Sequence, residues 1–268
     1  AITQRYVIIA ENGLRLPSLR ALLDLALMNN PFIESFEWHP NEPSRFIVID
    51  KDTGEVVRIT ETDPFFVFHH INAYEDAATG DLVLDMSVYD NNDVVNSFYL
   101  DNLRGDGYPR YSGEFRRYCI PMQAGKPVTH SKLTDASIDL PRINYKPYNG
   151  QPYGFAYGIS ARPNTDTFVD QIVKVDTRTG EALTWHEPGH YPGEPVFVAA
   201  PNASSQSQGQ TKNQHEEDNG VVLTAVLDAA KGTSYLLVLD GKTFQPMARA
   251  DVPHHVPFGF HGQFFHDA

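Results

Sequence analysis

The stretch that decides the fold is RFIVIDKDTGEVV, residues 45–57, in which two strand-like runs flank Asp50 and Gly54. The pattern returns as QIVKVDTRTGEAL, residues 171–183, and as SYLLVLDGKTFQPM, residues 234–247. An Asp side chain can hydrogen-bond the turn backbone, and a glycine is free to take a positive φ. Each copy therefore predicts a β-hairpin.

The spacing of these hairpins indicates a repeat. Asp176 follows Asp50 by 126 residues and Asp240 follows Asp176 by 64, so the unit is about 63 residues, with a degenerate copy near FRRYCIPM, residues 115–122. Units of about 40 to 50 residues with four strands are typical of propeller blades, and long loops lengthen them. Four units fill the chain. Because four blades is the lower limit for a closed ring, we expect an all-β fold of about four blades, with further blades outside this chain.

Two stretches depart from the strand pattern. Leucines recur at helical spacing over residues 17–28, where Pro17 and Ser18 are suited to a helix start, so a short helix is predicted. Residues 201–220, PNASSQSQGQTKNQHEEDNG, are polar and lack apolar periodicity. They predict a mobile surface loop within a single propeller domain that otherwise spans residues 1–268.

Composition excludes some classes of protein. The 34 acidic and 21 basic residues give a formal charge of −13, which repels a phosphate backbone, so nucleic acid is not an expected partner. The single cysteine, Cys119, cannot form an internal disulfide. No apolar run approaches the ~20 residues that span a bilayer, and the first residues lack the basic start of a signal peptide. We therefore expect a cytoplasmic protein.

Two histidine settings could hold a metal. His69 and His70 lie in VFHHINAYED, where successive strand side chains point to opposite faces, so at most one of them can face a propeller axis. His261 lies in VPFGFHGQFFHDA, among aromatic residues. Imidazole suits iron, zinc or copper, but an isolated histidine in an apolar strand is more often a core residue. Taken singly, each motif leaves both interpretations open.

Two carboxylates could orient such histidines. A ligating histidine needs its second ring nitrogen held by a carboxylate or a carbonyl. Glu194 in YPGEPVFVAAP and Asp139 in SIDLPRINY stand among Pro and apolar residues. Glu194 has no local helix or turn role there, so we expect it to have a partner elsewhere in the fold.

Five separated stretches together resemble the carotenoid cleavage oxygenases, the group that includes β-carotene dioxygenases and the retinal pigment epithelium isomerase. They are FHHINAYED, DLPRINYKPYNGQPYGFAYG, YPGEPVFV, EEDNGVVLTAVLD and SYLLVLDGKTFQPMARADVPHHVPFGFHGQF, and they run over essentially the whole chain. The resemblance implies a seven-bladed β-propeller with one Fe(II) on its axis, held by four histidines from four blades.

The resemblance also implies residue roles. His69 and His261 correspond to the third and fourth iron ligands, and His70 has no metal role. Glu194 is expected to orient His261. Asp139 stands where the family has glutamate, and its shorter side chain predicts that a backbone shift or a bridging water completes its bond to His69. The first two ligands do not occur here, so we expect this chain to be a C-terminal half and the missing N-terminal half to supply them.

The implied activity is that of a non-haem dioxygenase. It would cleave a double bond of a carotenoid or apocarotenoid with O2, giving retinal-type aldehydes, in an apolar tunnel reached from a membrane that residues 14–28 contact peripherally. On the same fold, O2-independent retinoid isomerisation and stilbene-type cleavage stay open. A metal-free binding propeller is the alternative of another class, and it predicts that His69 and His261 lie far apart or face outward. A propeller glycosidase would need paired axial carboxylates, and none has a convincing context.

Overall fold

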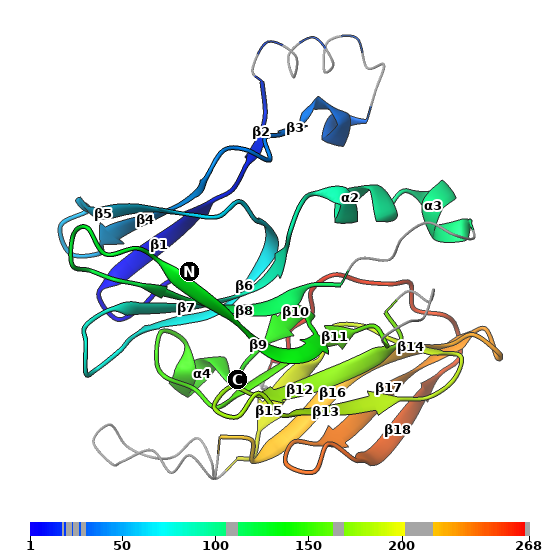
Figure 1. The fold of residues 1–268 in the computed structure, drawn as a ribbon. Coiled ribbons are helices and arrows are strands. Elements are labelled where there is room, and N and C mark those ends of the chain that lie inside the picture. Colours follow the sequence, from blue (N-terminus) through cyan, green and yellow to red (C-terminus); the bar gives the residue numbers. More distant parts are fainter. Residues whose placement is uncertain are drawn as a thin grey trace.

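The computed structural model describes residues 1–17, 19, 23, 27, 31–105, 112–162, 169–201 and 217–265. Antiparallel strands form four successive sheets (Figure 1). The first contains β1 (Tyr6–Glu11), β4 (Ser44–Asp50) and β5 (Val56–Thr62). The second contains β6 (Phe66–Glu75), β7 (Leu82–Tyr89), β8 (Glu114–Ile120) and β9 (Thr129–Ser137).

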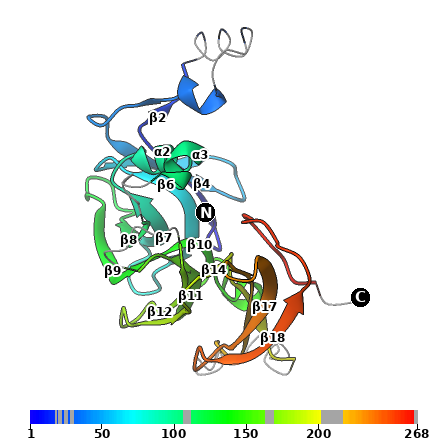
Figure 2. The ribbon, with the colours of Figure 1, turned by 90° about the vertical axis from the view of Figure 1, so that its right-hand side faces the viewer.

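The third and fourth sheets continue the same pattern. The third contains β10 (Asp139–Arg142), β11 (Phe155–Ser160), β12 (Gln171–Asp176) and β13 (Ala182–His186). The fourth contains β14 (His190–Pro192), β16 (Gly220–Asp228), β17 (Thr233–Asp240) and β18 (Pro246–Val252), and β15 (Val196–Ala199) also pairs with β16. Figure 2 shows the sheets following one another in an arc, as propeller blades do. The degenerate copy predicted near residues 115–122 is β8 and the start of the turn that leads to β9.

The hydrophobic core consists of clusters between successive sheets. Phe46 of the first sheet packs with Tyr118 of the second. Phe115 of the second sheet shares a cluster with Val173 of the third, and Tyr157 of the third shares one with residues of the fourth. The residues named are at most 1% exposed. Because each cluster combines side chains from two neighbouring sheets, the blades are held face to face.

The predicted hairpins at Asp50, Asp176 and Asp240 are present, joining β4 to β5, β12 to β13 and β17 to β18. In the first, Oδ1 of Asp50 accepts hydrogen bonds from the main-chain N–H groups of Asp52 (3.0 Å) and Thr53 (2.9 Å). The aspartate therefore closes the turn as its chemistry predicts.

The residue four positions after each turn aspartate has a left-handed backbone. Gly54 (φ 74°) and Gly180 (φ 78°) supply it in two hairpins, but Phe244 (φ 58°) does so in the third. The same turn also forms at Asp76 and Asp228, which the sequence analysis did not predict. For Asp76 the signal was present, since DAATG has the spacing of DKDTG.

Outside the four larger sheets, β2 (Leu14–Arg15) and β3 (Glu37–Trp38) pair with each other as a two-stranded sheet. The remaining short elements are η1 (Phe32–Ser35), α2 (Asp93–Ser97), α3 (Leu100–Arg104) and α4 (Tyr145–Tyr148). Of the helix predicted over residues 17–28, most positions lie outside the described residues, but Leu19, Leu23 and Leu27 are helical and more than half exposed. Within the described part of the chain, no helix is long and apolar enough to cross a bilayer. Of the predicted loop, residues 202–216 lie outside the described residues, whereas Glu217 and Asp218 are buried.

Candidate metal centre

His69 lies on β6, between two register shifts in the pairing of β6 with β7. Its Nδ1 is 2.6 Å from Oδ1 of Asp139, the first residue of β10. The contact is a direct hydrogen bond from the imidazole N–H to the carboxylate, so no bridging water is needed. It joins the second sheet to the third.

The backbone is irregular where Asp139 reaches His69. Leu140 has φ 42°, and the pairing of β10 with β11 shifts register between Asp139 and Arg142. Oδ1 of Asp139 also accepts the main-chain N–H of Leu140 (2.8 Å). The hydroxyl of Tyr89 donates a short hydrogen bond to Oδ2. Both carboxylate oxygens therefore have donors.

His261 lies on the segment that follows β18. Its Nδ1 is 2.8 Å from Oε1 of Glu194, and the N–H of Gly262 donates to Oε2 (2.7 Å). The side chain of Glu194 is only 4% exposed, so these donors compensate for the loss of water around the carboxylate. Arg142 adds hydrogen bonds to the carbonyl of Gly262 (2.8 Å) and to Oε1 of Gln263 (2.9 Å).

The two histidines meet although they come from the second sheet and from beyond the fourth. The ring centroids of His69 and His261 are 5.2 Å apart and the rings are nearly perpendicular, at 80°. Within the described chain, nothing hydrogen-bonds Nε2 of either ring. The binding-propeller alternative predicted that the two histidines lie far apart or face outward. Their rings lie together, although the side chain of His261 is 56% exposed.

His70 stays outside this pair. Its Nε2 is buried and has no hydrogen-bond partner among the described residues. Burial lowers the pKa of His70 to about 4, so its ring is neutral at pH 7. It lies opposite Met86 of β7.

The residues present suit a transition metal. Two imidazoles, each with Nδ1 held by a carboxylate, form the usual ligand arrangement for iron, zinc or copper. The described residues contain no group of three or more His, Cys, Asp or Glu side chains that could hold a metal ion. The described residues thus offer two candidate ligands, and the metal roles of His69, His261, Asp139 and Glu194 stay a prediction.

Aromatic side chains extend from His69. Phe68 contacts Phe66, Tyr89 and Phe98 at centroid distances of 4.7, 5.8 and 6.0 Å. Phe68 and Phe98 are 40% and 45% exposed, whereas Phe66 is buried in the core. The PFFVF stretch therefore divides between the core and an apolar surface beside His69.

Tyr89 and Arg142 are contacts of the site that were not predicted from the sequence. Arg142 stands in the quoted DLPRINY stretch, three residues after Asp139, so an arginine so close to a candidate orienting carboxylate could have been singled out. Tyr89 offers no comparable signal, because only the pairing of β6, β7 and β8 brings the end of β7 to Asp139.

Comparison with known proteins decides the family. The family model described as retinal pigment epithelial membrane protein matches residues 1–266. The chain belongs to this family. Among family relatives, a mitochondrial carotenoid-cleaving dioxygenase of Mustela putorius furo is 31% identical over 98% of this chain and 53% of that protein. A carotenoid isomerooxygenase of Galleria mellonella is 33% identical over 98% and 51%.

Solved structures of the retinal pigment epithelial membrane protein family agree. Cobalt-substituted Synechocystis ACO has a TM-score of 0.77 and 27% identity, covering 98% of this chain and 51% of that one. A D477G ACO/RPE65 chimera has a TM-score of 0.79 at 27% identity, covering 97% and 51%. These matches confirm the predicted family and propeller fold. The chain spans about half the length of these relatives.

Proposed function

We propose that the whole protein is a non-haem Fe(II) dioxygenase that cleaves a carotenoid or apocarotenoid double bond with O2, giving retinal-type aldehydes. The observation that carries this proposal is the convergence of His69 and His261, each with Nδ1 on a carboxylate and Nε2 free of partners in the described chain. Relatives named for carotenoid cleavage and isomerooxygenation support the substrate class.

The protein's own residues would prepare the site. Asp139 and Glu194 fix the proton on Nδ1 of each ring, which directs the Nε2 lone pair of His69 and His261 toward a metal. Iron, when bound, supplies the O2 chemistry. The exposed faces of Phe68 and Phe98 offer an apolar surface for a polyene beside His69. No side-chain acid or base is required.

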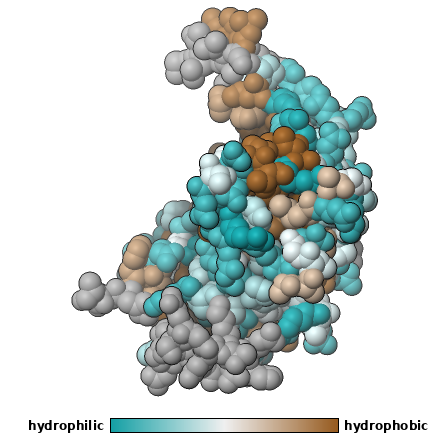
Figure 3. Space-filling view, turned by 90° about the vertical axis from the view of Figure 1, so that its left-hand side faces the viewer, coloured by the Kyte–Doolittle hydropathy of each residue, from teal (hydrophilic) through white to brown (hydrophobic). Residues whose placement is uncertain are grey.

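The remaining ligands would come from outside this chain, on further blades. Hydrophobic side chains gather on the outer face of the first sheet (Figure 3), where Ile9 and Ile59 flank Ile47 in register and are 46% and 54% exposed. An exposed apolar row of this kind suits packing against another blade, and this supports the proposal.

Peripheral membrane contact is a part of this proposal. Leu19, Leu23 and Leu27 share one helical face and are 73%, 52% and 62% exposed, and Phe32 is 55% exposed. Cosedimentation with phospholipid vesicles tests it. Replacing the three leucines with serine should abolish vesicle binding. Unchanged binding would show that this surface does not contact the membrane.

Iron content and O2-dependent cleavage of β-carotene by the whole protein test the proposed activity, beside His261→Ala. His255→Ala is the matched control, since His255 is an exposed histidine on the same segment. We expect about one iron and aldehyde products in the unchanged protein and the control, and loss of both in His261→Ala. A protein that holds no iron, or a His261→Ala variant with unchanged iron and products, would overturn the proposal.

A further inference from the structure

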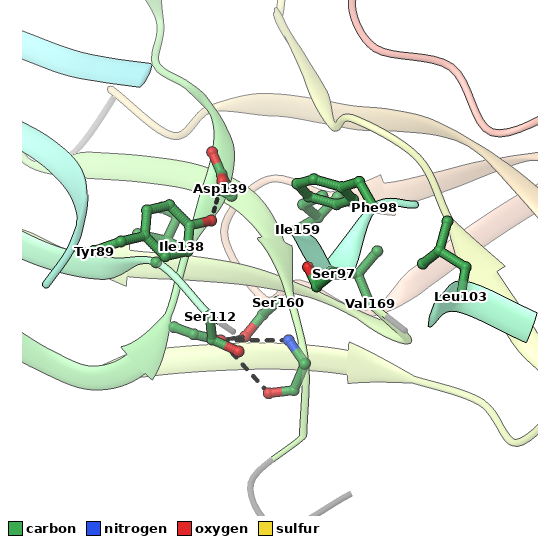
Figure 4. Close-up of a pocket in the computed structure, with 13 residues that line it drawn as sticks. Tyr89, Ser97, Phe98, Leu103, Ser112, Ile138, Asp139, Ile159, Ser160 and Val169 are labelled. Carbon is green, nitrogen blue, oxygen red and sulfur yellow. Dashed lines mark hydrogen bonds between the residues drawn. The ribbon is translucent and has the colours of Figure 1, made fainter. Parts of the chain in front are cut away.

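Tyr89 reaches the candidate metal centre from outside it. The residue ends β7, is 7% exposed, and packs its ring against Phe66 and Phe68. Its hydroxyl donates to Oδ2 of Asp139, and Figure 4 shows the two side chains facing each other at a cavity of about 60 Å³. A phenylalanine ring could pack here equally well, so packing does not explain why the residue carries a hydroxyl that bonds Asp139.

The donors around Asp139 are divided between its two oxygens. Oδ1 receives the N–H of His69 and the main-chain N–H of Leu140. Oδ2 receives the Tyr89 hydroxyl. Because the terminal torsion of aspartate is broad, a carboxylate held through one oxygen can turn about its axis. A donor on the second oxygen fixes the plane of the carboxylate and hence the direction of its bond to His69.

The backbone beside Asp139 also needs support. Leu140 has φ 42°, a left-handed conformation that is unfavourable for a non-glycine residue. Such a conformation persists only where surrounding contacts hold it. Leu140 is 8% exposed, and the register shift in β10 follows directly. The Tyr89 hydrogen bond is a side-chain contact that holds Asp139 in this bend.

We infer that Tyr89 is a positioning residue, which fixes the short carboxylate of Asp139 so that Asp139 can orient His69 toward a metal. This inference rests on the proposed function. It predicts that the Tyr89 hydroxyl, rather than its ring, determines how firmly His69 is held.

Tyr157 provides a matched control. Its hydroxyl is also buried, but it has no hydrogen-bond partner among the described residues, and its ring stacks on Phe197 at 5.3 Å. Tyr89→Phe and Tyr157→Phe therefore remove the same atom from two buried tyrosines, and only one of these atoms contacts Asp139.

The experiment is a titration of the metal-free whole protein with Co(II), followed by its visible absorption spectrum, because a cobalt-substituted relative has been crystallised. We expect Tyr89→Phe to weaken Co(II) binding about tenfold and to change the spectrum, as is usual when the partner of a ligating histidine is disturbed. Tyr157→Phe should stay within about twofold of the unchanged protein, with the same spectrum.

Asp139→Glu supplies the second arm. The extra methylene would bring the carboxylate against the Tyr89 hydroxyl, so this substitution alone should weaken Co(II) binding. In the Tyr89→Phe variant the hydroxyl no longer occupies this space, so a glutamate at position 139 can reach His69 without help from Tyr89. The double variant should therefore bind Co(II) more tightly than Tyr89→Phe alone.

The outcomes separate the two proposals. If the unchanged protein binds Co(II) and Tyr89→Phe binds it equally well with the same spectrum, for example because water from the cavity replaces the hydroxyl, the role of Tyr89 is overturned and the proposed function stands. Equal losses in Tyr89→Phe and Tyr157→Phe would also overturn it, as a general packing effect. If the unchanged protein binds no metal, both proposals fall.

Discussion

Arg142 donates a hydrogen bond to the main-chain carbonyl of Gly262, at 2.8 Å. Gly262 follows His261, and Arg142 ends the four-residue strand β10, whose first residue, Asp139, contacts His69. One short strand of the third sheet therefore contacts His69 through the carboxylate of Asp139 and the residue after His261 through the guanidinium of Arg142.

Arg142→Met should loosen the segment that carries His261. It removes the hydrogen bonds to Gly262 and Gln263 and the 3.8 Å ion pair with Glu194, but leaves the hydrogen bond between Glu194 and His261. We expect faster amide hydrogen exchange over residues 256–265, measured by mass spectrometry. Arg249→Met, which breaks an exposed pair with Glu187 on the fourth sheet, is the control. Unchanged exchange in Arg142→Met would show that Arg142 does not hold the segment.

Glu194→Gln should weaken metal binding by about 10–100-fold. The two groups that hydrogen-bond the carboxylate, Nδ1–H of His261 and N–H of Gly262, are donors, and an amide can accept only through its single oxygen. Titration of the metal-free whole protein with Fe(II) under anaerobic conditions measures the change. Glu187→Gln, in the turn between β13 and β14, should have no effect, and an equal effect of both substitutions would contradict the assigned role of Glu194.

Two turn glycines should differ in their tolerance of alanine. Gly54 has φ 74° with no atom within 4 Å of an added Cβ, so Gly54→Ala should cost only the backbone strain, about 1 kcal/mol. At Gly180 (φ 78°) the Cβ would lie 2.3 Å from the carbonyl oxygen of Leu133, so the cost should be larger by about 1–3 kcal/mol. Urea denaturation midpoints compare them. Equal midpoints would contradict the predicted clash.

Glu217 should make stability fall as pH rises. Burial raises the pKa of Glu217 to about 7, although main-chain N–H groups of Phe155 and Gly154 favour the ionised form. The folded protein therefore holds this proton more tightly than the unfolded chain. The stabilisation is fully present below pH 4.5 and is lost as pH rises through 7.

Glu217→Gln isolates this effect, since glutamine does not titrate. Between pH 5 and 8 the unchanged protein should lose about 1–3 kcal/mol relative to Glu217→Gln, measured by urea denaturation at each pH. If the difference in the free energy of unfolding between the two proteins stays constant from pH 5 to 8, the main-chain donors keep Glu217 ionised over this whole range.

The sequence by itself determined the local features of this protein. The turn at Asp50 forms from its own side chain and from a glycine four residues later, so its chemistry lies within a few residues of sequence and could be predicted. The spacing of such turns predicted blades, and the resemblance indicated His69, His261, Asp139 and Glu194 together.

Only the tertiary structure decided how these residues meet. Which of His69 and His70 turns to His261 depends on the register of β6 against β7, and the Asp139 carboxylate reaches His69 because β10 bends at Leu140. The contacts of Tyr89 with Asp139 and of Arg142 with Gly262 join separate sheets or segments. The physical reason is that these contacts depend on the packing of whole blades, which buries side chains remote in sequence, and no local pattern encodes that packing.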